Sequence, residues 1–281
     1  MILPTFILKS RQNQTWQYSG MDSYKRCLDK KHFSEYPYKV SYNYNSRGFR
    51  DDEWPNDDKL QDCIWCFGDS FTVGLGSPVE HTWVNLLQQK TGKRCINISM
   101  DGASNAWIAD KVTAVAETIN PKQMVVQWSY GNRAQHSDTS LSDEDRKIYI
   151  EYVTLSEQIS AFKHDLDRVK TYPIVHSMIP DAFPENDSWN RIKDDHWPDV
   201  SCITELPKNI LAEIKQVHKC YDDVKDYFND MPFRKELQSL KEMNQMIVVE
   251  HIDYARDYHH YDIKTATELV NQIIKQLNNY E

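Results

Sequence analysis

The chain has 281 residues, of which 40% are hydrophobic, 27% charged and 12% aromatic, and its formal net charge at pH 7 is -9. A chain of this size and composition can bury a core as one large domain, or as one domain with an insertion, and does not have the composition of a disordered protein. The acidic balance, without clustered Lys and Arg, argues against a nucleic-acid partner and against an anionic membrane surface.

The first eight residues are apolar, but they carry no basic segment and no small-residue cleavage site, so we do not expect a signal peptide. No stretch approaches the length of a membrane span. Six cysteines are too few and too scattered for a disulfide framework. The closest pair, Cys63 and Cys66, falls in a predicted strand, where residues three apart face opposite sides. We therefore expect reduced, buried thiols in a cytoplasmic protein.

Residues 1–62 are polar, Tyr-rich and irregular, and we expect them to form a lead-in that packs over the edge of a domain spanning residues 63–281. That domain begins with a short apolar run from Cys63 to Phe67, which indicates a strand buried on both faces. Gly68, Asp69 and Ser70 follow directly. In open α/β sheets, ligands bind in the crevice outside the carboxyl ends of the strands, so this serine is a candidate nucleophile. A solvated serine in a plain strand-to-helix turn is the alternative.

The next segments alternate between helix and strand. The pattern predicts a helix from about Ser77 to Lys90 with Thr82 as a rival N-cap, a strand over 94–98, a helix over 107–119 and a strand over 123–129. Such alternation is typical of a parallel sheet with helices on both faces, in which every strand-end turn lies at the same edge.

The second half of the chain continues this pattern with one interruption. An amphipathic helix is predicted over 143–170, strands over 172–179 and 245–249, and a closing helix from Ile263 to Leu277. Between the last two strands, we expect residues 181–243 to form a helical insertion, which would set specificity if it borders the site.

Asp257 and His260 follow the fifth predicted strand. A serine hydroxyl needs a base within hydrogen-bond reach, and that base needs a carboxylate to orient it, so these two side chains could activate Ser70. A histidine beside an acid on an exposed loop is the alternative, and His259 is a neighbouring candidate for the base. A metal site made of His259, His260 and Asp262 is a further option, but adjacent histidines converge poorly on one ion.

Four pieces of the chain together resemble the signature blocks of the SGNH (GDSL-like) hydrolases. They are Gly68-Asp69-Ser70-Phe71, Gly102 within residues 101–105, Gly131-Asn132 after the third strand, and Asp257-x-x-His260 near the C-terminus. They occur in the family's order, and residues 45–50 are similar to a lead-in that many members carry. In this chain Tyr130 and Arg133 stand where the family usually has a glycine and an acid.

The resemblance implies a flavodoxin-like three-layer α/β/α sandwich with five parallel strands. It also implies that Ser70 is the nucleophile, His260 the general base and then acid, and Asp257 the orienting carboxylate. The backbone N–H groups of Ser70 and Gly102 and the side-chain amide of Asn132 would form the oxyanion hole. No metal and no cofactor are expected.

The expected function is a serine esterase that hydrolyses an O-acyl ester through an acyl-enzyme. A short acyl group such as acetyl is favoured, with a carbohydrate among the candidate alcohols, because no amphipathic lid or lipid-facing stretch suggests long chains. A thioesterase or lysophospholipase of the same family is the alternative within the enzymes. A non-catalytic module that holds a glycan with Trp189 and Trp197 is an alternative of another class. The sequence leaves the oligomeric state open.

Overall fold

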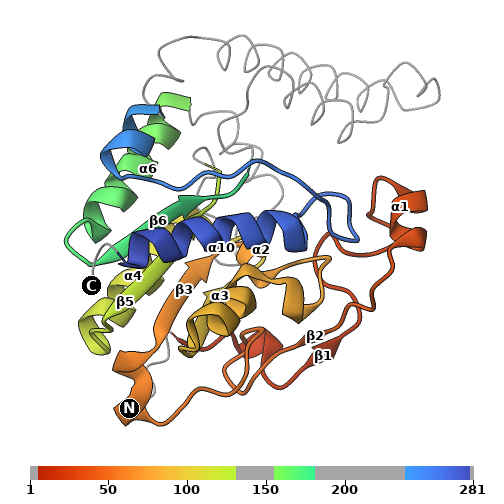
Figure 1. Ribbon diagram of the computed structural model, residues 1–281, viewed down its shortest axis with the longest axis horizontal. Helices are drawn as coiled ribbons and strands as arrows, with labels where there is room; N and C mark the ends of the chain where they lie inside the picture. Colours follow the sequence, from red (N-terminus) through yellow and green to blue (C-terminus); the bar gives the residue numbers. More distant parts are fainter. Residues whose placement is uncertain (1–5, 131–154, 181–237, 279–281) are drawn as a thin grey trace, which may run out of the picture.

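The computed structural model describes residues 6–130, 155–180 and 238–278. Within these residues, four parallel strands form one sheet at the centre of the molecule (Figure 1). They are β3 (Ile64–Gly68), β4 (Cys95–Ser99), β5 (Gln123–Trp128) and β6 (Ile174–Met178). Nearly every residue of these strands is buried, which explains their continuous apolar runs.

The strand order is β4-β3-β5-β6. Counted along the chain this order is 2-1-3-4, the start of the flavodoxin-like order 2-1-3-4-5. The order reverses at β3, so the crevice between the carboxyl ends of β3 and β5 is the place where such sheets bind ligands. The turn that carries Ser70 leaves β3 at that point.

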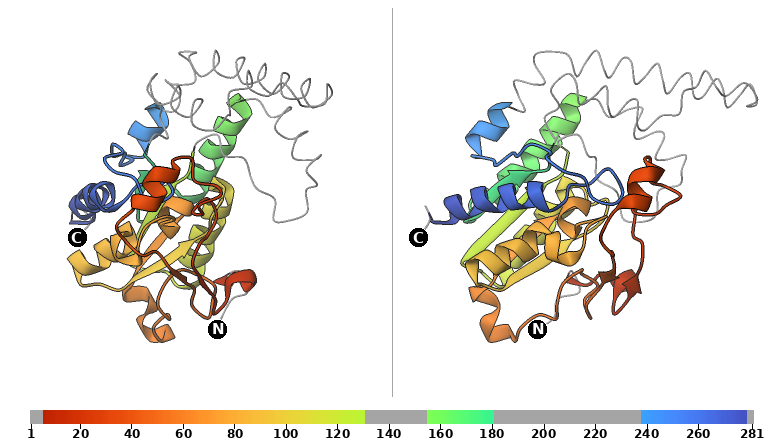
Figure 2. Two further views of the ribbon diagram at one scale, coloured as in Figure 1. Left: turned by 90° about the vertical axis from the view of Figure 1, so that its right-hand side faces the viewer. Right: turned by 45° about the vertical axis from the view of Figure 1, so that its right-hand side comes forward.

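Helices cover both faces of the sheet. α3 (Trp83–Thr91) packs beside α10 (Ile263–Asn278) on one face, and α4 (Asn105–Thr118) packs beside α6 (Leu155–Val169) on the other, as the side-on view in Figure 2 shows. The structure therefore confirms the α/β class and the three layers. No helix within the described ranges has the length and apolar character of a membrane span.

The expected fifth strand is reduced to one residue. Ile247 forms a single parallel bridge with Ser177, in which its N–H donates to His176 O and its carbonyl accepts from Met178 N–H, both at 2.9 Å. Gln245 has a left-handed backbone with φ 48°, and the N–H of the next residue donates to the preceding helical turn. The chain is therefore turned away until Ile247, and the described sheet has four strands instead of five.

Two predicted helix starts are also corrected. Residues Val79–His81 form a short 3-10 turn (η4), and α3 begins only after Thr82, whose hydroxyl accepts from Asn85 N–H at 3.4 Å. The rival cap is thus the cap that the chain uses. α4 begins earlier than expected, because the Ser104 hydroxyl accepts from Trp107 N–H at 3.2 Å.

Three other expectations fall partly outside the described residues. The long helix predicted over 143–170 is described only as α6. The insertion predicted over 181–243 is described only from residue 238. Cys27, Cys63, Cys66 and Cys95 are buried free thiols, as expected of them, and the remaining two cysteines lie in ranges that are not described.

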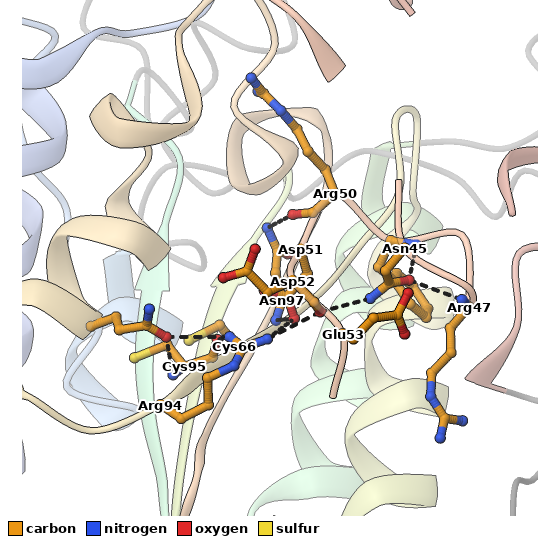
Figure 3. A network of polar contacts seen from close by, with 12 residues as sticks. Asn45, Arg47, Arg50, Asp51, Asp52, Glu53, Cys66, Arg94, Cys95 and Asn97 are labelled. Atoms are coloured by element: carbon orange, nitrogen blue, oxygen red, sulfur yellow. Dashed lines mark hydrogen bonds and ion pairs between the residues drawn. The ribbon is translucent and has the colours of Figure 1, made fainter. Parts of the chain in front are cut away.

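The N-terminal segment up to β3 has little regular structure. It contains η2 (Lys9–Arg11), β1 (Thr15–Trp16), α1 (Lys30–Glu35), β2 (Tyr42–Asn43) and η3 (Asp57–Asp62). Part of it covers the edge strand β4: the Asp51 carboxylate accepts from Asn97 N–H at 3.2 Å and pairs with Arg94 at 2.8 Å (Figure 3). An edge strand leaves N–H groups unpaired, and here a side chain takes one of them.

Candidate active site

The turn after β3 holds Ser70 at the first position of α2 (Ser70–Val73). Asp69 is the N-cap of this short helix, and its Oδ1 accepts from Phe71 N–H at 3.0 Å. The turn needs glycine at position 68, because a Cβ atom there would lie 2.0 Å from Thr72 Oγ1. The strand therefore passes directly into the helix, and the serine is 5% exposed at the sheet's carboxyl edge.

The structure brings Ser70, His260 and Asp257 together in one hydrogen-bonded chain. His260 Nε2 lies 2.8 Å from Ser70 Oγ, and His260 Nδ1 lies 2.6 Å from Asp257 Oδ2. An ionised carboxylate can only accept, so the imidazole Nδ1 carries the proton and its Nε2 lone pair faces the serine. This is the geometry that a serine nucleophile, a general base and an orienting acid require.

The conformation of the loop that carries His260 is fixed by Asp257. Its Oδ1 accepts from the N–H groups of His259 at 3.1 Å and His260 at 3.0 Å, while its Oδ2 meets the imidazole. The carboxylate thus fixes both the backbone and the ring of the histidine. The Phe71 ring packs against the His260 ring with 4.5 Å between centroids, and this contact also restricts the movement of the imidazole.

The charges of the pair support each other. Burial alone would raise the pKa of Asp257, but the charge of His260 and its hydrogen bond outweigh burial and hold the pKa at about 2. Burial likewise opposes protonation of His260, yet the Asp257 charge outweighs it and raises the pKa of the imidazole above its usual value. Asp257 is therefore ionised near neutral pH, and His260 is a stronger base than a free histidine.

One of the predicted oxyanion donors follows the neighbouring strand. Gly102 lies in the turn after β4, next to the Ser70 turn, because Ser99 pairs with Gly68 in the sheet. It has φ 75°, and the space where a side chain would begin is open. Within the described part of the chain, the N–H groups of Ser70 and Gly102 donate no hydrogen bond, so both can serve an oxyanion.

The third predicted donor, Asn132, lies outside the described residues. The chain leading to it is held by Asn105, which no sequence motif singled out. Asn105 Oδ1 accepts from Ser129 N–H and its Nδ2 donates to Tyr130 O, both at 2.9 Å. A buried asparagine at the start of α4 thus fixes the end of β5. The signal available in the sequence was its place in the same small-residue turn as Gly102.

Asp69 has a second role that the motif alone did not reveal. Its Oδ2 accepts from the Ser129 hydroxyl at 2.6 Å, so the acid beside Ser70 connects the ends of β3 and β5. Asp69, Ser129 and Asn105 are all buried. Together they join the chain segments that follow β3, β4 and β5.

The alternative metal site does not form around Asp262. Its carboxylate is hydrogen-bonded to His81 Nδ1 at 2.7 Å, to the Ser77 hydroxyl at 3.0 Å and to the Tyr36 hydroxyl at 2.5 Å. His259 packs its ring against Phe71 and His260 instead. Within the described residues, no three metal-ligating side chains converge.

Comparison with protein-family models and with curated proteins finds no match. Several solved structures are similar in fold. A member of the lipolytic G-D-S-L family from Veillonella parvula is 11% identical, with 75% of this chain and 96% of that chain covered and a TM-score of 0.42. An esterase from Pseudoalteromonas sp., solved with a monoethylphosphonate inhibitor, is 11% identical, with 78% and 98% covered and a TM-score of 0.42.

A putative lipolytic G-D-S-L protein from Desulfitobacterium hafniense is 14% identical, with 76% of this chain and 98% of that chain covered and a TM-score of 0.40. Two of these three proteins bear the name of the family that the four sequence blocks resemble. At these TM-scores, the functional conclusion depends on the site geometry and not on the likeness.

Proposed function

We propose that the protein is an SGNH-type serine esterase, which hydrolyses O-acyl esters through an acyl-enzyme. The observation that carries this proposal is the continuous chain from Asp257 through His260 to Ser70, with links of 2.6 and 2.8 Å. A buried carboxylate, an imidazole of raised pKa and a hydroxyl in line are the parts that activate a serine.

The mechanism follows from these positions. Ser70 Oγ attacks the ester carbonyl carbon while His260 Nε2 takes the hydroxyl proton, and Asp257 stabilises the imidazolium that forms. His260 then gives that proton to the leaving alkoxide, and the acyl group stays on Ser70 as an ester. Water, activated by His260, attacks this ester and releases the acid and the free serine.

The negative charge of each tetrahedral intermediate falls on the former carbonyl oxygen. In this proposal it accepts hydrogen bonds from the N–H groups of Ser70 and Gly102 and from the Asn132 amide. Donors that are fixed before the reaction cost no reorganisation when the charge develops, and their stabilisation of that charge usually lowers the barrier more than any other single effect.

For the substrate we propose a short acyl group such as acetyl, with a carbohydrate as the alcohol. The support is the absence from the sequence of an amphipathic lid or lipid-facing stretch. A thioesterase or a lysophospholipase would use the same triad. A glycan-binding module would keep the fold without chemistry, but a base held at 2.8 Å from a buried hydroxyl favours the enzyme.

A substrate panel separates these functions. Acetylated sugars, acyl-CoA thioesters and lysolipids are each offered to the wild-type protein, with Ser70→Ala as the blank. The proposal predicts Ser70-dependent release of acetate from at least one acetyl ester. Faster turnover of a thioester or lysolipid would move the assignment to that class, and no turnover of any ester would favour the binding module.

A further inference from the structure

We propose that Asp22 is a positioning residue of this site: its ion pair with Arg256 holds the loop that carries Asp257 and His260 against Ser70. The inference rests on the proposed function, because it assigns a role to the N-terminal segment in the same reaction. Asp22 would act on the chemistry only through Arg256, the neighbour of the orienting acid.

The ion pair is buried and two-pronged. Arg256 Nε donates to Asp22 Oδ1 at 2.9 Å, and Arg256 Nη2 donates to Asp22 Oδ2 at 2.6 Å. The Asp22 side chain is 0% exposed and also accepts from the Tyr42 hydroxyl. The guanidinium lies over the rings of Tyr18 and Phe33, at 5.1 and 5.0 Å from their centroids. Such a bidentate pair fixes direction as well as distance.

The backbone beside Asp257 is held as well. His32 Nε2 donates to Ala255 O at 2.8 Å, and Arg256 N–H donates to Gly76 O at 3.0 Å. The loop before α10 runs alongside α1 in both Figure 1 and Figure 2. The N-terminal segment therefore contacts both residues that precede Asp257. His32 binds the backbone of Ala255, and Asp22 binds the side chain of Arg256.

This loop needs an external hold because its own conformation is unfavourable. Tyr258, between Asp257 and His260, has φ 56°, a left-handed backbone that a bulky residue rarely adopts. The loop closes through Ala255 N–H to His260 O at 2.7 Å and Tyr258 N–H to Ala255 O at 3.0 Å. Strained residues persist at sites where surrounding contacts over-determine them. The Asp22–Arg256 pair supplies such contacts directly next to the strain.

The experiment compares two substitutions that remove a buried carboxylate from the N-terminal segment. Asp22→Asn breaks the pair that reaches the catalytic loop. Asp51→Asn is the matched control, because Asp51 pairs with Arg94 at 2.8 Å and is 8% exposed, but that pair reaches the edge strand β4. The readouts are kcat and KM for a small acetyl ester, thermal stability, and the low-field NMR signal of the His260 Nδ1 proton, which is hydrogen-bonded to Asp257.

We expect Asp22→Asn to lower kcat by about 100-fold, the size of effect that a misplacement of roughly 1 Å produces, while KM changes much less. The His260 signal should broaden or disappear. Asp51→Asn should lose stability yet keep kcat and the signal close to those of the wild type. The positioning role is overturned if Asp22→Asn keeps both kcat and the His260 signal. It is also overturned if, in both variants, the loss of kcat is no larger than the loss of thermal stability accounts for.

The proton signal also separates this inference from the proposed function. If the wild-type protein hydrolyses no ester, the proposed function fails, and the signal alone then decides the inference. Its loss in Asp22→Asn but not in Asp51→Asn supports the positioning role, and its retention in both overturns it.

Discussion

His260 Nε2 lies 2.8 Å from Ser70 Oγ, although 190 residues separate the two along the chain. The sheet makes this possible, because Ser70 leaves the carboxyl end of β3 and the loop that carries His260 packs over the same edge before α10 begins. Neighbouring side chains hold each of the two residues in position: Asp69 caps the helix that begins with Ser70, and Asp257 fixes the orientation of the His260 ring.

Replacing Asp257 with asparagine should lower kcat on the order of 10⁴-fold while the fold is kept. An amide at this position can donate to His260 Nδ1, which would turn the lone pair away from Nε2 and leave Ser70 without a base. The measurement is steady-state hydrolysis of a small acetyl ester, with circular dichroism to check folding. A loss below about tenfold in a folded variant would contradict the role of Asp257.

The activity should fall in acid with a midpoint above the usual histidine value of about 6.5. The Asp257 charge raises the pKa of His260, and a protonated imidazole cannot take the serine proton, so kcat/KM is lost as the pH falls through this raised pKa. A pH profile of kcat/KM measures the midpoint. A midpoint clearly below about 6.5 would contradict the raised pKa of the base.

The same pair makes a prediction for stability. The pKa of Asp257 is lowered to about 2, so the stabilisation from its ionised form is present above its unfolded value and is lost as the pH falls towards 2. The raised pKa of His260 contributes stabilisation that is present in full below about 6.5 and is lost as the pH rises through the folded value. The free energy of unfolding in urea should therefore differ most between wild type and His260→Gln at pH values above the unfolded pKa of Asp257 and below about 6.5. An equal difference across the whole range would contradict the ion pair.

Replacing Asn132 with alanine should lower kcat by about 10²- to 10³-fold with little change in KM, because the proposed mechanism counts its side-chain amide as one oxyanion donor. The assay is again hydrolysis of a small acetyl ester. Unchanged hydrolysis would mean that Asn132 is not a donor, while the roles of Ser70, Asp257 and His260 could stand.

Replacing Gly68 with alanine should destabilise the protein and should also abolish the reaction of Ser70 with a fluorophosphonate. Its Cβ would lie 2.0 Å from Thr72 Oγ1 and 3.0 Å from Gln127 O, inside the packed turn. Overpacking of this kind costs roughly 1–3 kcal/mol in the free energy of unfolding. Gly92→Ala is the control, because nothing lies within 4 Å of its Cβ, although its φ of 67° still disfavours a side chain. Urea unfolding that finds Gly68→Ala as stable as the wild type would contradict the close approach.

Much of the fold follows from local pattern. Buried parallel strands show as apolar runs, and β3 to β6 were all visible in this way, as were the turns that follow β3 and β4. The closing helix was equally clear, since Ala266, Val270 and Ile273 are buried on one face of α10 as its spacing predicts. The prediction of a full fifth strand was wrong because the apolar run gives no sign of the left-handed backbone of Gln245, which turns the chain away from the sheet.

The polar network of the site was less accessible to prediction. Ser70, Asp257 and His260 were predicted because four sequence blocks, in their order, resemble those of one hydrolase family. The Asp22–Arg256 pair joins residues 234 positions apart with no motif around either, so only the fold reveals it. Asn105 was hidden for a related reason, because its side chain serves the backbone of β5 and leaves no spacing signal.

The most direct test of the account is whether Ser70 is a nucleophile that His260 activates. Intact-protein mass spectrometry after incubation with a fluorophosphonate, followed by peptide mapping, measures this without knowledge of the substrate. We expect one adduct per chain, located on Ser70, absent in Ser70→Ala and formed far more slowly in His260→Ala. Wild-type protein that stays unmodified under conditions that label a known serine esterase, or that carries the adduct on another residue, would contradict the account.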